Sequence, residues 1–148
     1  MSEIFASPDL QTAAVQLVRL LAALLCSGAI GFEREWRHHS AGLRTHMLVG
    51  VGACLFTLLM TILIGSVDAD RIRSDPLRVV EAVTSGVAFL AAGAIIQSRG
   101  KVHGLTTGAS LWLAGAIGLA CGLGEYILAI LAVIVTLLVL AIVRLFER

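Results

Sequence analysis

The sequence GFEREWRHHSAGLRTHMLVG, residues 31–50, gathers charged side chains and histidines between two apolar runs. If the first run continues as a helix, Glu33 and Arg37 lie four residues apart, where an ion pair stabilises a helix by about 0.2–0.5 kcal/mol. Such a pair holds charges in a defined arrangement at the edge of a membrane. Arg44 follows, and its planar guanidinium can bind a phosphate, a carboxylate or backbone carbonyls. Thr45 can cap the next helix.

A second polar stretch, GAIIQSRGKVHGLTTGASLW at residues 93–112, precedes another apolar run. Thr106 or Thr107 can cap the helix that starts there. The free amides at a helix start favour an anion or an acidic side chain, so Glu33 or Glu35 is a natural partner within the chain. Ordinary helix capping is the alternative interpretation of these threonines.

The histidines raise the question of a metal site or a catalytic centre. His38 and His39 lie three and four residues after Glu35, but the sequence has no H-E-x-x-H motif and no cysteine nearby. It also has no evident nucleophile–base pair, and its three cysteines lie in apolar runs as small packing residues. We therefore expect no metal site, no cofactor and no enzymatic activity. The alternative is a pH response of these histidines, with His103 at the same edge.

The composition indicates which elements must position these side chains. Of the 148 residues, 58% are hydrophobic and 14% are charged, whereas soluble domains carry about 25% charged residues. Apolar runs of about 20 residues cross a bilayer as helices. We therefore expect an all-α polytopic membrane protein with one domain over residues 1–148; the net charge of +1 gives no indication of nucleic-acid binding. The predicted spans are 10–32, 46–65, 77–97, 108–123 and 126–144.

Five spans put the two termini on opposite sides of the membrane. Lysine and arginine residues outside the spans favour the side of the C-terminus, which predicts a cytoplasmic C-terminus and an external N-terminus. Both polar stretches then face the cytoplasm, and Trp112 falls near an interface, as an aromatic anchor does. The alternative is that the two stretches act only as topology signals.

Arg19 and Glu81 fall inside the predicted spans, away from the span edges. An arginine at the middle of a membrane costs about 2.5–3.5 kcal/mol, so Arg19 should be paired or should reach toward the interface. By depth, Glu81 is the expected partner of Arg19. The pair is a structural ion pair or, alternatively, part of a gate or ion path.

Small residues recur at intervals of four residues, as in Ala23–Ser27–Gly31 and Ala114–Gly118–Gly122. Such faces let helices approach closely, within one chain or between chains. Because five helices offer a limited interior, we expect a homo-oligomer, with a dimer favoured.

Several motifs, in order and at matching spacing, resemble the membrane domain of the MgtC/SapB family. The matching elements are Gly31–Glu35, Ala41–Thr45, Gly104–Thr107 and Trp112, and the resemblance covers roughly residues 15–130. The chain departs from the family pattern at Ala88 and Ala91, where glycines are usual, and at Glu81, where a neutral residue is expected. Longer members also carry an ACT-like domain after the fifth span, so this chain resembles a short form without it.

The resemblance implies a multi-pass protein of the bacterial inner membrane, linked to magnesium limitation, acid stress and virulence. It implies modulation of other membrane machines, notably the F-type ATP synthase. We therefore expect a non-enzymatic regulator that acts through lateral helix contacts and through a cytoplasmic rim. The alternative is a small channel or transporter for an ion or a small solute, with Mg²⁺ or another cation as the ion. The rim residues would be Glu33, Arg34, Glu35, Arg44, Thr45, His103, Thr106, Thr107 and Trp112.

Overall fold

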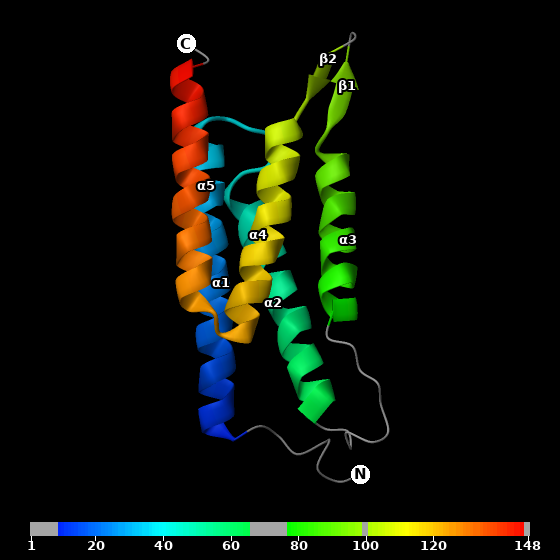
Figure 1. The fold of residues 1–148 in the computed structure, drawn as a ribbon, viewed down its shortest axis with the longest axis vertical. Helices are drawn as coiled ribbons and strands as arrows, with labels where there is room; N and C mark the ends of the chain where they lie inside the picture. Colours follow the sequence, from blue (N-terminus) through cyan, green and yellow to red (C-terminus); the bar gives the residue numbers. More distant parts are fainter. Residues whose placement is uncertain (1–8, 66–76, 99–100, 147–148) are drawn as a thin grey trace.

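A computed structural model describes residues 9–65, 77–98 and 101–146. Within these residues the chain forms five α-helices and one short β-hairpin (Figure 1). The elements are α1 (Leu10–Trp36), α2 (Leu43–Gly65), α3 (Leu77–Gly93), β1 (Ile96–Ser98), β2 (Lys101–His103), α4 (Leu105–Leu123) and α5 (Tyr126–Phe146).

The helical fold predicted from the sequence is confirmed. Three of the helices, α1, α2 and α4, are long and apolar enough to cross a membrane. Helix α3 has 17 residues, and the described apolar part of α5 covers Tyr126–Ile142. The number of spans and the orientation of the termini stay predictions.

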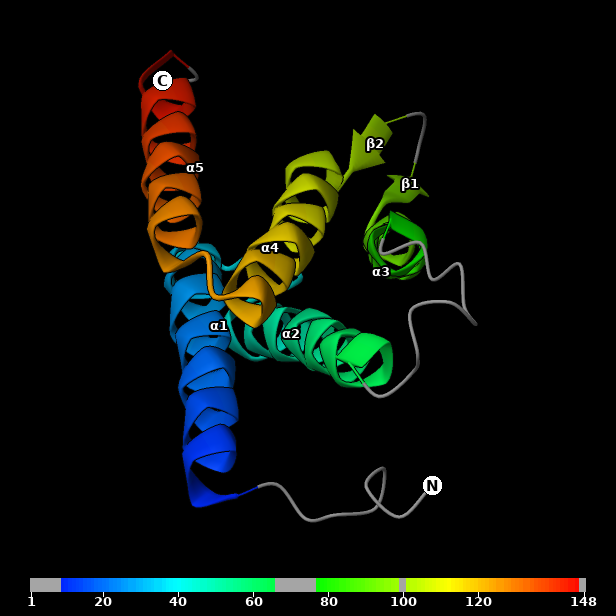
Figure 2. The same cartoon turned by 60° about the horizontal axis from the view of Figure 1, so that its bottom comes forward.

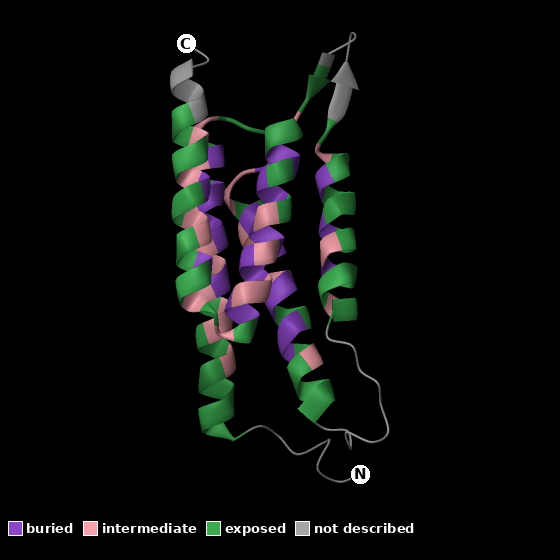
Figure 3. Ribbon diagram, viewed as in Figure 1, coloured by how far each residue is buried: buried purple, intermediate pink, exposed green. Residues whose placement is uncertain are grey.

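Helix α4 lies at the centre of the bundle, with α2, α1, α3 and α5 all packed against it. Figure 2 shows α3 standing apart from α1 and α5, on the far side of α4. The buried residues lie mainly along the facing sides of α1, α2 and α4 (Figure 3). One apolar cluster joins α1, α2, α4 and α5, and a second joins α2, α3 and α4.

Two glycines set the close approach of these helices. A Cβ atom at Gly50 of α2 would collide with Ser27 of α1. A Cβ atom at Gly118 of α4 would collide with the carbonyl of Gly50 and would lie 2.9 Å from the Cβ of Ala53. The small-residue spacing at Gly118 therefore serves packing within one chain; the predicted homo-oligomer stays a prediction.

The helix ends differ from the predicted span edges. Helix α1 continues to Trp36, past the apolar run, because a helix ends where its backbone turns and not where hydropathy falls. Helix α3 ends at Gly93, and β1 and β2 follow as an antiparallel pair in which Ile96 is opposite His103. The hairpin was missing from the sequence-based prediction, because strands of three residues show no usable periodicity.

Candidate functional site

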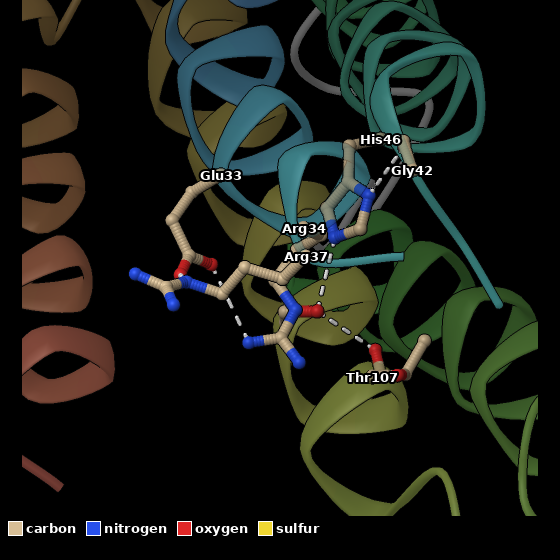
Figure 4. A network of polar contacts seen from close by, with 7 residues as sticks. Glu33, Arg34, Arg37, Gly42, His46 and Thr107 are labelled. Carbon is tan, nitrogen blue, oxygen red and sulfur yellow. Dashed lines mark hydrogen bonds and ion pairs between the residues drawn. The ribbon is translucent and has the colours of Figure 1, made fainter. Parts of the chain in front are cut away.

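The end of α1, the start of α2 and the start of α4 meet in a network of polar contacts (Figure 4). Backbone carbonyls and side chains both contribute to it, and most of the participating side chains are removed from solvent. We call these contacts the polar cluster. It has two hydrogen-bonded groups, one of Glu33, Arg34 and Arg37 at the end of α1 and one of Gly42, His46, Thr107 and Ser110 at the starts of α2 and α4.

The turn after α1 brings this network together. The amides of Arg37 and His39 both donate to the carbonyl of Arg34, at 3.3 and 3.1 Å, which satisfies a carbonyl left free at the helix end. His38 adopts a left-handed conformation with φ 57°, which reverses the chain. The six-residue connector, 37–42, then leads directly into α2, so the two helix ends are held side by side.

Arg34 is the buried charge of the polar cluster, with an exposed fraction of 4%. One terminal guanidinium nitrogen lies 3.4 Å from a carboxylate oxygen of Glu33, and the same carboxylate accepts a hydrogen bond from Nε of Arg37. The predicted pairing of Glu33 with Arg37 is therefore confirmed. Two guanidinium groups share one carboxylate, so this part of the cluster carries a net positive charge. Nε of Arg34 is buried and has no acceptor in the part of the chain that the structure describes.

His46 joins α2 to α4 and is fully buried. Its Nδ1 lies 2.8 Å from the carbonyl of Gly42, which can only accept, so Nδ1 carries a proton. Its Nε2 lies 3.0 Å from the hydroxyl of Ser110, which is also 2.9 Å from the carbonyl of Thr107. The sequence analysis did not single out His46 or Ser110. The available signal was a histidine one turn inside an apolar helix, where a polar ring needs a partner.

Glu35 caps the start of α2, because its carboxylate accepts a hydrogen bond of 2.8 Å from the amide of Leu43. The expected caps were different: Thr45 for this helix, and Glu33 or Glu35 as the acid at the start of α4. Both expectations are wrong, because α2 begins at Leu43 and the short connector places Glu35 directly before it. Gly42 leaves room for this cap, since a side chain at position 42 would displace the Glu35 carboxylate.

The start of α4 is also built differently from the prediction. The N-cap residue is Gly104, in the left-handed region with φ 86°, and no side chain caps the helix. Thr106 and Thr107 lie inside the first turn, so neither can be the cap that the sequence suggested. Thr107 is buried in the polar cluster, whereas Thr106 is exposed.

The remaining rim residues lie outside the polar cluster. Arg44 and Thr45 are exposed and line a groove between α2 and α3. His103 is exposed on β2, and Trp112 is partly exposed on α4. The structure thus brings together Glu33, Arg34 and Thr107 of the predicted set, places Glu35 beside them as a cap, and separates the others.

Arg19 is held at the opposite end of α4. Its guanidinium donates a hydrogen bond of 2.8 Å to the carbonyl of Gly122, in the last turn of that helix. A cation is favourable there, because the free carbonyls give the helix end a partial negative charge. The predicted pair with Glu81 is wrong: Glu81 is exposed on α3, and α4 lies between α3 and α1. Depth in the membrane did not reveal which helices are neighbours.

Glu35→Gln is expected to destabilise the protein by about 0.3–1 kcal/mol, the usual value of a negative charge at a helix N-terminus. The amide oxygen of glutamine accepts a weaker hydrogen bond than a carboxylate, and it interacts less favourably with the helix dipole. Thermal unfolding in detergent measures the loss, and Glu81→Gln, at an exposed glutamate, is the matched control. Equal midpoints for the two variants would contradict the capping role.

His39 is expected to titrate below the ordinary histidine pKa of 6.5. Partial burial lowers the pKa of His39 most, followed by the nearby Arg34; Glu33 opposes the shift, and Arg37 adds to it. The lowered pKa means that the fold favours neutral His39. Its stabilising contribution is present above pH 6.5 and is lost as the pH falls through the folded-state pKa.

An NMR titration of labelled histidine measures the His39 midpoint directly. We expect the midpoint to rise in Arg37→Gln, because a nearby positive charge is removed. A wild-type midpoint at or above 6.5 would contradict this electrostatic description.

The polar cluster is suited to hold a fixed arrangement of charges at one end of the bundle, because two guanidinium groups share one carboxylate. Among the described residues, no group of three or more histidine, cysteine, aspartate or glutamate side chains is placed to hold a metal ion. His46 joins α2 to α4 through Ser110, and Glu35 joins the end of α1 to the start of α2.

Comparisons with known proteins give a consistent result. The family model described as "MgtC family" matches residues 20–148. The chain is 42% identical over 125 residues to "Putative magnesium transporter YhiD" of Escherichia coli (strain K12), covering 84% of this chain and 58% of that protein. It is 41% identical over 125 residues to "Protein MgtC" of Brucella abortus (strain 2308), covering 84% of this chain and 50% of the relative.

A third relative is "Protein MgtC" of Salmonella typhimurium (strain LT2), with 40% identity over 121 residues, 82% of this chain and 49% of the relative. The chain therefore spans about half the length of the curated relatives that it matches. No solved structure matches it significantly.

Proposed function

The chain belongs to the MgtC family, and from this premise we propose that it is a non-enzymatic regulator of another membrane complex. Family membership and the long apolar helices indicate a membrane protein. The names of the relatives do not decide how such a small helical protein acts: one is "Putative magnesium transporter YhiD", and the others are "Protein MgtC".

The polar cluster is the observation that carries the proposal. His46 and Ser110 tie α2 to α4, and Glu35 holds the start of α2. Each of these groups forms hydrogen bonds with other residues of the chain, which suits a site of fixed shape. A fixed surface at the end of a bundle is what a lateral or end-on protein contact requires, since little ordering is needed on binding.

We place the protein in the bacterial inner membrane as a multi-pass homo-oligomer, with the N-terminus outside and the polar cluster at the cytoplasmic face. The F-type ATP synthase is the proposed partner complex, in the setting of magnesium limitation, acid stress and virulence. The residues on the surface around the cluster, notably Thr106 and Trp36, are exposed and available for such a contact.

Magnesium transport is the second candidate, because one relative carries the name "Putative magnesium transporter YhiD". The described interior favours it less. Arg19, well inside α1, and Arg34, in its last turn, are positive charges, and a positive charge raises the energy of a passing cation. Mg²⁺ is bound in proteins through carboxylates and retained waters, so these two arginines are unsuited to bind it.

Inverted membrane vesicles distinguish the two candidates. We would compare ATP-driven with respiration-driven proton pumping in vesicles from cells without the chain and from cells that contain the wild type or Arg34→Gln. The two proteins are matched in membrane level, and Arg78→Gln is the control variant. The proposal predicts that the wild type lowers only ATP-driven pumping, that Arg34→Gln restores it, and that Arg78→Gln behaves as wild type. Loss of both pumping signals would indicate an ion leak and favour transport. An unchanged ATP-driven signal would contradict the proposed partner.

A further inference from the structure

A groove of about 850 Å³ runs between α2 and α3. These two helices make few contacts with each other, since α3 packs mainly on α4. Large apolar side chains line the groove and stay exposed, among them Leu48, Phe56 and Leu90.

Two glycines keep this groove open. Gly52 of α2 and Gly86 of α3 both line it, and a Cβ atom built at either position would meet no atom within 4 Å. They differ from Gly50 and Gly118, which close helix packing requires. The missing side chains at these two positions therefore add to the open space of the groove.

The two ends of the groove differ in chemistry. Arg44 and Thr45 line it at the start of α2, whereas Leu63 and Val79 line it at the other end. Arg78 is exposed next to that other end but does not line the groove. Arg44 is exposed and forms no ion pair within the part of the chain that the structure describes. As the second residue of an apolar helix, it lies at the level of the lipid headgroups.

We propose that this groove binds the acyl chain of one anionic phospholipid, whose phosphate is held by Arg44 and Thr45. Charge complementarity identifies the ligand: a cationic and hydroxyl-bearing mouth leads into an apolar channel, which matches an anionic head on a hydrocarbon tail. The dimensions agree. From Arg44 to Phe56 is about 18 Å along the helix, and the hydrocarbon of one leaflet is about 15 Å deep. This site is separate from the polar cluster and does not depend on the proposed regulatory role.

Native mass spectrometry of the delipidated protein in detergent tests the headgroup contact. Phosphatidylglycerol is titrated against phosphatidylcholine with the same acyl chains. One arginine near an anionic headgroup raises affinity about fivefold. We therefore expect the first phosphatidylglycerol to bind about five times more tightly than the first phosphatidylcholine. Arg44→Gln should abolish the preference, and Arg78→Gln, near the other end of the groove, should keep it. Equal behaviour of the two variants would overturn the proposal.

Filling the groove tests the acyl-chain contact. Gly52→Leu with Gly86→Leu should lower the binding of both lipids several-fold, because the added side chains occupy the groove. The melting temperature should stay near that of the wild type, because a Cβ atom at either position meets no atom within 4 Å. Unchanged lipid binding in this folded variant would overturn the proposal. The proposal would also be overturned if the wild type formed a lipid-free dimer and the two leucine substitutions dissociated it. A second copy of the chain would then occupy the groove.

Discussion

Gly118→Val, in α4, should lose much more stability than Gly86→Val, in α3. The added Cβ collides with the backbone carbonyl of Gly50, and the carbonyl cannot move without shifting α2. Overpacking of this kind costs about 1–3 kcal/mol, and more when backbone must give way. Because α2 and α4 share the most extensive helix contact of the bundle, we expect little folded protein in the membrane.

Gly86→Val is the matched control for this prediction. It makes the same chemical change in a helix where the new side chain meets no atom within 4 Å. Size-exclusion chromatography and thermal unfolding in detergent compare the two variants. If Gly118→Val unfolds at the same temperature as Gly86→Val, the close approach of α2 and α4 is wrong.

His46→Ala should cost about 2–4 kcal/mol. The substitution leaves a cavity where a fully buried ring was packed, and core truncations of this size fall in that range. It also removes the contact with Ser110 that joins α2 to α4. Most of the loss comes from the cavity, because two hydrogen bonds remain. The Gly42 carbonyl still accepts from the backbone amide at position 46, and the Ser110 hydroxyl still donates to the Thr107 carbonyl.

Leu48→Ala is the control for the His46 variant, since Leu48 lies two residues further along α2 and is 72% exposed. Unfolding in detergent should separate the two midpoints clearly. Hydrogen exchange should in addition show faster exchange in the first turn of α2 for His46→Ala alone. Similar midpoints and similar exchange would mean that His46 does not hold these helices together.

The sequence was a reliable guide to where helices occur, because long apolar runs have a single stable conformation in a membrane. It placed α5 and most of α2 and α3 within a few residues. It missed the last turn of α1, where charged residues continue the helix, and the hairpin after Gly93. Hydropathy measures which segments avoid water, and it carries no information on where the backbone turns.

The residues of the candidate site were easier to predict than their partners. Glu33, Arg34, Glu35 and Thr107 do lie at one end of the bundle, as their positions at helix ends suggested. Their contacts depend on the length of the connector and on which helices are adjacent, and neither follows from spacing within a helix. For the same reason the partner of Arg19 was found on α4 and not on α3.

The central claim is that the end of the bundle around the polar cluster contacts another membrane complex. Photo-cross-linking in living cells tests it most directly, with the cross-linking amino acid at Thr106 or at Leu123. Both positions are exposed and lie at opposite ends of α4, so they form a matched pair. We predict a cross-link to a subunit of the F-type ATP synthase from position 106 and none from position 123. Cross-links to the synthase from neither position, or only from position 123, would contradict the account.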